Sequence, residues 1–262
     1  MNVIRKVLVP FNFSKEANNA LDYAISFIGD EYEIKLDLIC VVAEDEEQVE
    51  ITKMESRFQN FIDKSKDSTK IKINYTVERG DLIKNVLAFQ EEHDIDIIFM
   101  GTGGEHHLTD EGVTNTSELV IKAECPVIVV PEVFKEFHVE NITLAVGNNE
   151  LDDPKALSTL LAVARKFNAN IHVLTIYKEE EDYLADNKNE SILKYYLDRF
   201  YRQSSFAVSK NIADSIIAYE KKEEIDMLAI IPRNHATRTK PSEGKLTKWL
   251  SIKTDIPLLT ID

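Results

Sequence analysis

Glycines, hydroxyl side chains and a predicted helix start come together in one segment of the chain. Residues 100–116 read MGTGGEHHLTDEGVTNT, and a helix is predicted to follow. Glycine lets a ligand approach the backbone closely, and the first turn of a helix offers unsatisfied N–H groups with positive partial charge. Gly101 and Gly104 could therefore admit phosphate oxygens. Thr114, Asn115 and Thr116 would add side-chain donors.

A purely structural interpretation of the same segment is open as well. Gly101 and Gly104 would then only form a turn after a strand, and Thr114 or Asn115 would cap the following helix. From spacing alone this second interpretation is favoured.

The sequence gives little support to catalysis. No lysine follows the glycines as in a phosphate-binding loop of an NTPase, and neither cysteine nor serine stands in a nucleophile-elbow context. Glu105, His106 and His107 are adjacent, but neighbouring residues rarely converge on one metal ion, so we expect them on a surface loop. No metal spacing is formed by the other histidines, His93, His138, His172 and His235.

Continuous apolar runs and helical patterns alternate along the first half of the chain. This order predicts a parallel sheet covered on both faces, with strands near residues 3–9, 36–42, 71–77, 95–100 and 126–130. The clearest helix begins after Ser14, its predicted N-cap. Its buried stripe is predicted from the three-and-four spacing of Ala17, Ala20, Leu21, Ala24, Ile25 and Ile28.

The same pattern recurs about 130 residues later, as expected of a duplicated unit. VLVPFN leads into the helix after Ser14, and LAVGNN leads into a second helix, predicted to begin near Asp153 and Pro154. That second helix places Leu157, Leu160, Leu161 and Ala164 on one stripe. IDIIFM recurs as IDMLAI, and CPVIVV recurs as IPLLTI. The chain is therefore predicted to form two domains, residues 1–135 and 136–262.

The last strand of each unit, 127–130 and 258–261, is a predicted sheet edge. Exposed apolar edges tend to find partners, so we expect these two edges to meet and to make the chain an internal pseudo-dimer. Whether two such chains pair further as a homodimer stays open.

Composition restricts the classes of partner. A formal net charge of −15 argues against a general nucleic-acid binder and against a protein that binds anionic membranes. The N-terminus shows no signal-peptide pattern and no run reaches membrane-spanning length, which predicts a cytoplasmic protein. Cys40 and Cys125 are predicted to be reduced core thiols.

Taken together, these patterns resemble a tandem universal stress protein, from about Ile4 to Ile261. The resemblance implies an α/β fold of two tandem Rossmann-like (adenine nucleotide alpha hydrolase-like) domains, each a five-stranded parallel sheet flanked by helices.

The family resemblance also implies a ligand, ATP or AMP. In nucleotide-binding members the phosphate loop reads Gly, two residues, Gly, nine residues, Gly, then Ser or Thr. Gly101 and Gly104 match the first two glycines, and Thr114 with Asn115 matches the hydroxyl-bearing end. Val113 stands at the third glycine, next to Gly112, and a β-branched side chain there predicts weaker phosphate binding.

Two further positions are assigned to the nucleoside by the resemblance. The family's Asp after the first strand aligns with Asn12, which lacks the charge-assisted bond of a carboxylate to a hydroxyl. Weaker ribose recognition is the consequence. Val41, at the end of the second strand, would form part of the adenine wall.

The second half departs further from the family pattern. IPRNH at residues 231–235 replaces the glycine turn, and only Gly244 remains before the next helix, so this half is predicted to be structural. A locally basic stretch includes Arg233, Arg238, Lys240, Lys245, Lys248 and Lys253. It is interpreted either as a solvated loop, which is favoured, or as a surface for an anion or a protein partner.

Three functional hypotheses follow. The first is a cytoplasmic stress-response binding and regulatory module that holds an adenine nucleotide in its first domain. The second is a nucleotide-free member that acts through protein contacts. A weak ATPase ranks last.

Overall fold

The computed structural model describes residues 4–31, 33–65, 69–103, 114–132, 136–146, 156–177, 188–231 and 244–261. The first half contributes β1 (Lys6–Pro10), α1 (Lys15–Ile28), β2 (Lys35–Val42), α2 (Gln48–Ser65), β3 (Lys72–Arg79), α3 (Leu82–His93), β4 (Ile97–Thr102), α4 (Asn115–Lys122) and β5 (Val127–Pro131). The second half contributes β6 (Asn141–Val146), α5 (Leu157–Phe167), β7 (Asn170–Tyr177), α7 (Lys188–Leu197), the 3-10 helix η3 (Asp198–Phe200), β8 (Tyr201–Val208), α8 (Ile212–Lys222), β9 (Met227–Ile230), α9 (Lys245–Lys253) and β10 (Leu258–Thr260).

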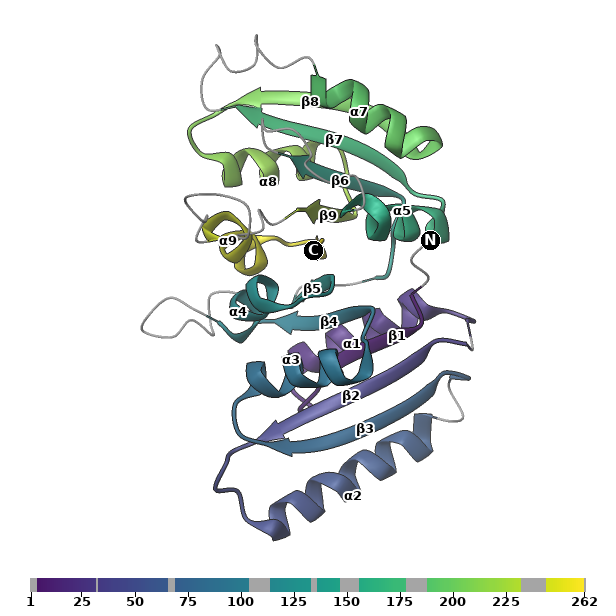
Figure 1. Cartoon of the computed structure of the whole chain (residues 1–262), viewed down its shortest axis with the longest axis vertical. Helices are drawn as coiled ribbons and strands as arrows, with labels where there is room; N and C mark the ends of the chain where they lie inside the picture. The colour runs from purple at the N-terminus through teal and green to yellow at the C-terminus, as the bar shows by residue number, and fades with distance from the viewer. Residues whose placement is uncertain are drawn as a thin grey trace.

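All of these strands join one ten-stranded sheet with helices on both faces (Figure 1). The strand order is β3-β2-β1-β4-β5-β10-β9-β6-β7-β8, so the second half repeats the order of the first in reverse. Within each half the five strands are parallel, and β5 pairs with β10 antiparallel. The predicted fold class and the predicted meeting of the two edge strands are therefore confirmed. We call the β5–β10 junction the seam.

One of the repeated sequence landmarks, the Ile-Asp pair, has a clear structural reason. A carboxylate oxygen of Asp96 accepts hydrogen bonds from the backbone N–H groups of Arg5 and Lys6, each at 2.8 Å. Asp226 accepts the equivalent pair at the start of β6, at 2.8 and 2.9 Å. Each Asp thus ties the start of the first strand of its unit to the start of the fourth, which explains why the Ile-Asp pair occurs twice.

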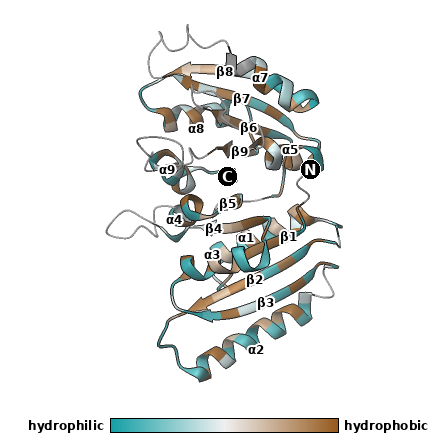
Figure 2. Cartoon of the chain, viewed as in Figure 1, coloured by the Kyte–Doolittle hydropathy of each residue, from teal (hydrophilic) through white to brown (hydrophobic). Residues whose placement is uncertain are grey.

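The buried side chains form two clusters, one on each face of the sheet. The first cluster joins the sheet to α1, α2, α5 and α7, and the second joins it to α3, α4, α8 and α9. Both clusters contain residues from both halves, so each core crosses the seam instead of lying within one half. The hydrophobic residues concentrate on the central strands, and the outer surfaces of the helices are hydrophilic (Figure 2). The boundary between residues 135 and 136 stays a prediction.

Helix α1 forms as predicted, but its buried face is wider than the predicted stripe. The Ser14 side chain accepts from the Ala17 backbone N–H at 3.2 Å and caps the helix. Tyr23 and Phe27 are fully buried beside the predicted stripe, whereas Ile25 is only half-buried. The reason is the second half: Tyr23 and Phe27 contact Phe137 and Phe167 through their rings.

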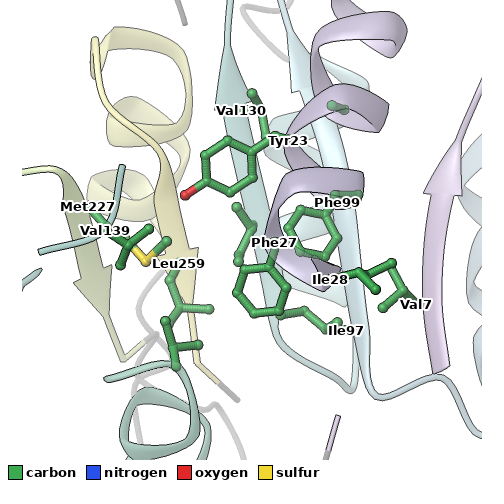
Figure 3. Packing of buried hydrophobic residues seen from close by; sticks show 14 of the residues in the cluster. Val7, Tyr23, Phe27, Ile28, Ile97, Phe99, Val130, Val139, Met227 and Leu259 are labelled. Atoms are coloured by element: carbon green, nitrogen blue, oxygen red, sulfur yellow. The ribbon is translucent and has the colours of Figure 1, made fainter. Parts of the chain in front are cut away.

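Figure 3 shows the consequence for the core at the seam. Tyr23 extends from α1 toward Val139 and Met227 of the second half, and Leu259 lies below its ring. Burial, with a smaller contribution from Asp226, raises the pKa of Tyr23 far above its ordinary value. The stripe of the second-half helix is similar, since Leu157, Leu160 and Ala164 are buried and Leu161 is half-buried. The predicted start of that helix at residues 153 and 154 lies outside the described residues.

Among the described residues, no helix combines the length and the apolar character needed to cross a membrane.

Candidate functional site

Strand pairing brings three of the predicted site residues together at the carboxyl ends of the central strands. Gly101 belongs to β4, Val41 to β2, and Asn12 follows β1, which lies between those two strands. The backbone N–H of Phe11 still bonds to Ile39 at 2.8 Å, which carries the β1–β2 pairing to the residue before Asn12. Since α4 begins after β4, its first residues lie at this edge as well. In open parallel sheets this is the edge where ligands bind, at the point where the strand order reverses.

Gly101 is required by packing against α1. A Cβ atom at this position would lie 2.0 Å from the backbone oxygen of Glu16 and 2.5 Å from its carbonyl carbon. Real Cβ atoms do not approach backbone atoms so closely, so only glycine lets the first turn of α1 rest on the end of β4. This contact accounts for Gly101 without a ligand.

Thr114 caps α4, as the structural interpretation predicted. Its hydroxyl accepts from the Ser117 backbone N–H at 3.0 Å, and the Ser117 hydroxyl accepts from the Thr114 backbone N–H at 2.9 Å. The two side chains therefore form a reciprocal capping box. Both residues are buried.

The start of α4 is also fastened to β4. The Thr116 hydroxyl donates to the backbone oxygen of Gly101 at 3.0 Å, so this donor is already used within the protein. Asn115, between the two threonines, is exposed. The exposed amide of Asn115 and the backbone N–H groups of Asn115 and Thr116 are the groups that α4 can offer to an anion, because the Ser117 N–H is used by the cap.

Asn12 lies on an unusual turn. Its side-chain oxygen accepts from the backbone N–H of Ser14 at 3.0 Å, and the residue between them, Phe13, has a left-handed φ of 63°. Such a φ is uncommon for an aromatic residue. The Asn12 side chain is exposed, and among the described residues its amide nitrogen has no hydrogen-bond partner, so it remains available to a ligand.

The packing of the Phe13 ring explains the turn. The sequence pattern did not predict this role for Phe13. The ring packs at 4.7 to 4.8 Å, centroid to centroid, from Phe58 and Phe11. Arg57 of α2 lies over the ring, with its guanidinium carbon 3.9 Å from the centroid. A cation–π contact of this kind stabilises the turn. The helical spacing of Phe58 and Phe61 beside Arg57 was the only signal in the sequence.

Val41 is half-buried in β2 and packs on the face covered by α3 and α4. Its neighbour Cys40 is buried, and burial raises the pKa of this thiol despite the opposing effect of Arg57. Both Cys40 and Cys125 are buried thiols, as predicted.

The residues present fit an adenine nucleotide in part. The exposed amides of Asn12 and Asn115 and the start of α4 are suitable donors, but Thr114 and Thr116 already bond within the protein. Part of the predicted phosphate loop lies outside the described residues, namely Gly104, Gly112 and Val113. The adjacent residues Glu105, His106 and His107 lie outside them as well.

The second half uses its remaining glycine for packing. Gly244, at the start of α9, has a left-handed φ of 61°, and a Cβ there would lie 2.3 Å from the end of the Ile121 side chain of α4. Figure 1 shows α4 and α9 side by side across the seam. Of the basic stretch, Lys245, Lys248 and Lys253 belong to α9, and Lys253 lies 5.9 Å from the Trp249 ring. Arg233, Arg238, Lys240 and His235 lie outside the described residues.

The described histidines show no metal site. Among the described residues, no group of three or more His, Cys, Asp or Glu side chains is placed to hold a metal ion. His138 bonds to Asp226 at 2.8 Å, which raises the pKa of His138. His172 is buried on β7, and burial lowers its pKa.

Comparisons with known proteins agree with this architecture. Residues 4–131 match the model of the universal stress protein family. A universal stress protein from Archaeoglobus fulgidus DSM 4304 superposes with a TM-score of 0.75 at 14% identity, over 100% of this chain and 99% of that one. The curated proteins contain no match to the sequence.

The same fold also occurs in another kind of protein. The cytoplasmic domain of a prokaryotic cation chloride cotransporter superposes with a TM-score of 0.55 at 12% identity, over 99% of this chain and 96% of that one. At such identities the likeness concerns the fold alone, so the function has to be argued from the site.

Proposed function

Because this chain belongs to the universal stress protein family, through a domain that spans residues 4–131, we propose that it is a stress-response binding module whose first half holds an adenine nucleotide. One observation carries the proposal. Asn12, Val41, Gly101 and the start of α4 gather at the edge of the sheet where the strand order reverses.

Each residue has a role in this proposal. Gly101, Gly104, Thr114 and Asn115 contact the phosphates, with the N-terminal turn of α4 contributing backbone donors. Asn12 and Val41 contact the nucleoside. The Asn12 amide replaces a carboxylate, so ribose is held by a neutral hydrogen bond and the affinity is modest. The second half is structural, and its Gly244 supports the contact with α4. With both thiols buried and reduced, the proposed compartment is the cytoplasm.

The second candidate is a nucleotide-free protein that acts through protein contacts. A specific observation favours it: the Thr116 hydroxyl donates to Gly101, and Thr114 and Ser117 bond to each other, so side chains expected at a phosphate bond internally instead. Gly101 is likewise explained by its contact with Glu16.

The deciding experiment starts from freshly purified protein. It is denatured, the released small molecules are analysed by mass spectrometry, and stripped, refolded protein is titrated calorimetrically with ATP and with AMP. A stoichiometric nucleotide or a clear binding heat supports the first candidate. Neither signal from a folded protein rejects it and favours the second.

Two substitutions locate the site. Asn12→Asp is expected to raise the affinity several-fold, because a carboxylate accepts from ribose hydroxyls more strongly than an amide does. Asn115→Ala is expected to lower it. The control is Asn60→Ala, at an exposed position of α2 away from this edge. Unchanged affinity in Asn12→Asp and Asn115→Ala would reject these assignments. ATP hydrolysis is tested by steady-state phosphate release, and a rate equal to that of buffer removes the weak ATPase.

A further inference from the structure

We propose that the free edge of β3 and the neighbouring helix α2 form a docking groove for an extended peptide segment that alternates apolar and acidic residues. The groove is independent of the nucleotide site. Strand β3 lies at one end of the sheet (Figure 1), and the lining residues place the groove beside its first part. The proposed nucleotide site lies where β1 and β4 end.

The position of the groove follows from the residues that line it. It has a volume of about 790 Å³, and it is lined by the consecutive residues 69–75 together with Gln59, Ile62 and Ser65 of α2. Successive side chains of a strand point to opposite faces of the sheet. A hollow that contacts every residue in succession therefore runs along the outer edge of β3.

A strand edge of this kind recognises other strands. Among the described residues, β3 pairs with β2 alone and ends the strand order, so its outer backbone N–H and C=O groups face the groove. An extended peptide laid along the edge satisfies these groups by adding one strand to the sheet. Helix α2 forms one wall of the groove, as expected of a site that holds the added strand on one side.

The two walls differ in chemistry, and this difference defines the partner. On the α2 side lie Ile62, Ile73 and Tyr75, with the Tyr75 ring stacked on Phe58 at 5.1 Å. On the opposite face lies Lys72, next to Lys35 in the β2–β3 register, with Lys70 close by in sequence. An added strand would alternate between these two walls. Its side chains should therefore alternate between apolar and acidic.

The lysines are well suited to an incoming acidic group. Lys35, Lys70 and Lys72 are exposed, and within the described part of the chain none of them forms an ion pair. The same face also carries Asp37, whose carboxylate accepts from the Asn74 amide at 2.8 Å, so the three lysines leave a local excess of positive charge on a protein with a net charge of −15. Steering toward an acidic segment is the expected consequence.

A second copy of the chain fits the edge poorly. Antiparallel two-fold pairing of β3 with β3 centred on the groove lining, at residue 72, would place the Lys72 side chains of the two copies opposite each other. Like charges on neighbouring strands are destabilising, and edge lysines commonly prevent such pairing. A peptide with acidic residues would instead place opposite charges on neighbouring strands, which is stabilising.

The test uses the full chain and a short blocked peptide that alternates valine and glutamate, with a fluorescent label. Binding is followed by fluorescence anisotropy, and the site is located by hydrogen exchange with mass spectrometry. The expected result is saturable binding together with slower exchange of the β3 backbone amides. A peptide that alternates valine and lysine should not bind.

Matched variants separate the groove from general charge effects. Lys70→Glu with Lys72→Glu should weaken binding about ten-fold, the effect of losing two surface ion pairs. Lys84→Glu with Lys210→Glu changes the net charge equally at exposed positions outside the groove and should have no effect. Gln59→Trp should block the groove, whereas Asn60→Trp, the neighbouring position outside the lining, should not.

Three results would overturn the proposal. The first is the absence of acidic-peptide binding to the folded chain. The second is binding that Gln59→Trp leaves unchanged. The third is concentration-dependent self-association that slows exchange in β3 without peptide, which would assign the edge to a second copy.

Discussion

Single residues at the proposed nucleotide site serve the fold before they serve a ligand. Gly101 lacks a side chain because Glu16 of α1 occupies the space, and the hydroxyl of Thr114 completes a capping box with Ser117. Residues that match a binding motif are therefore weak evidence of binding when the fold needs the same residue types. Asn12 and Asn115, which are exposed, carry the more informative chemistry.

We predict that Gly101→Ala destabilises the protein by about 3 kcal/mol, because the added Cβ atom would lie 2.0 Å from the Glu16 backbone oxygen and α1 must move. Urea unfolding followed by circular dichroism measures the effect. The same substitution in a Glu16→Ala background should cost as much, since the clash involves the backbone of residue 16. A loss below about 0.5 kcal/mol would show that the contact is easily relaxed.

We predict that Thr114→Ala costs about 1 kcal/mol of stability through the lost cap of α4. Asn115→Ala should leave stability nearly unchanged because Asn115 is exposed. Thermal unfolding of both variants tests this contrast. Equal losses would mean that the capping box contributes little.

The sequence predicted these site residues unevenly. The cap at Thr114 could be anticipated, since a threonine precedes an amphipathic run. Its reciprocal partner Ser117 was not identified, because the usual box has Glu or Gln there. The turn at Phe13 could not be predicted, because its positive φ depends on Phe11, Phe58 and Arg57, which only the tertiary fold brings together.

At the scale of elements, the two halves differ where one helix packs on the next. In the first half, the buried Gln90 of α3 accepts from the Glu124 backbone N–H at 3.1 Å, just after α4. In the second half the corresponding residue of α8 is Glu220, also buried, which lies near the end of α9. Burial, with help from Asp255, raises the pKa of Glu220 to about 8. An ionisable group thus stands where the first half has a neutral amide.

We predict that Glu220→Gln stabilises the protein at pH 8 by on the order of 3 kcal/mol, and much less at pH 5. The folded pKa of about 8 exceeds the ordinary 4.5 of this carboxyl. The unfolded chain therefore ionises first, and the contribution of Glu220 to stability falls as the pH rises from 4.5 to 8. Denaturant unfolding of both proteins at several pH values gives the difference directly.

A matched control is Glu223→Gln on the next turn, because Lys222 lowers the pKa of Glu223 and the sign reverses. This variant should be slightly less stable than the original chain at neutral pH. A stability difference between Glu220→Gln and the original chain that does not vary with pH would show that folding does not raise the pKa of Glu220.

The sequence predicted the elements more reliably than their packing. Each apolar run of the first half became a strand within a few residues of its predicted position. The central strands are buried on both faces and leave a continuous apolar signal, whereas β3 at the end of the sheet is only partly buried. The width of the buried face of α1 was underestimated. Tyr23 and Phe27 are buried by Phe137 and Phe167, which lie more than 100 residues later, and no local pattern reports such a contact.

At the scale of the whole molecule, the seam replaces what would otherwise be an exposed strand edge. β10 covers β5 in an antiparallel pair, and the two cores continue from one half into the other. The halves are therefore expected to depend on each other for stability, although each has its own complete set of five strands.

We predict that a fragment of residues 1–135 forms dimers, because removal of the second half exposes the edge of β5 and the apolar side chains of α1 around Tyr23 and Phe27. Light scattering after size exclusion, over a range of concentrations, measures the mass. The full chain over the same range is the control, since its two halves belong to one covalent chain and should not separate on dilution. A well-folded monomeric fragment at all concentrations would contradict the prediction.

The two halves differ in their glycines, and this difference has a consequence for the proposed binding of a nucleotide. The glycine turn after β4 has no counterpart after β9, where Ile231 follows, and Gly244 is occupied by its contact with Ile121. The proposed nucleotide site therefore occurs once in the chain, not as a coupled pair. Its saturation curve should then be a simple hyperbola with a Hill coefficient of about one, so that the response grows gradually with ligand concentration and lacks a threshold.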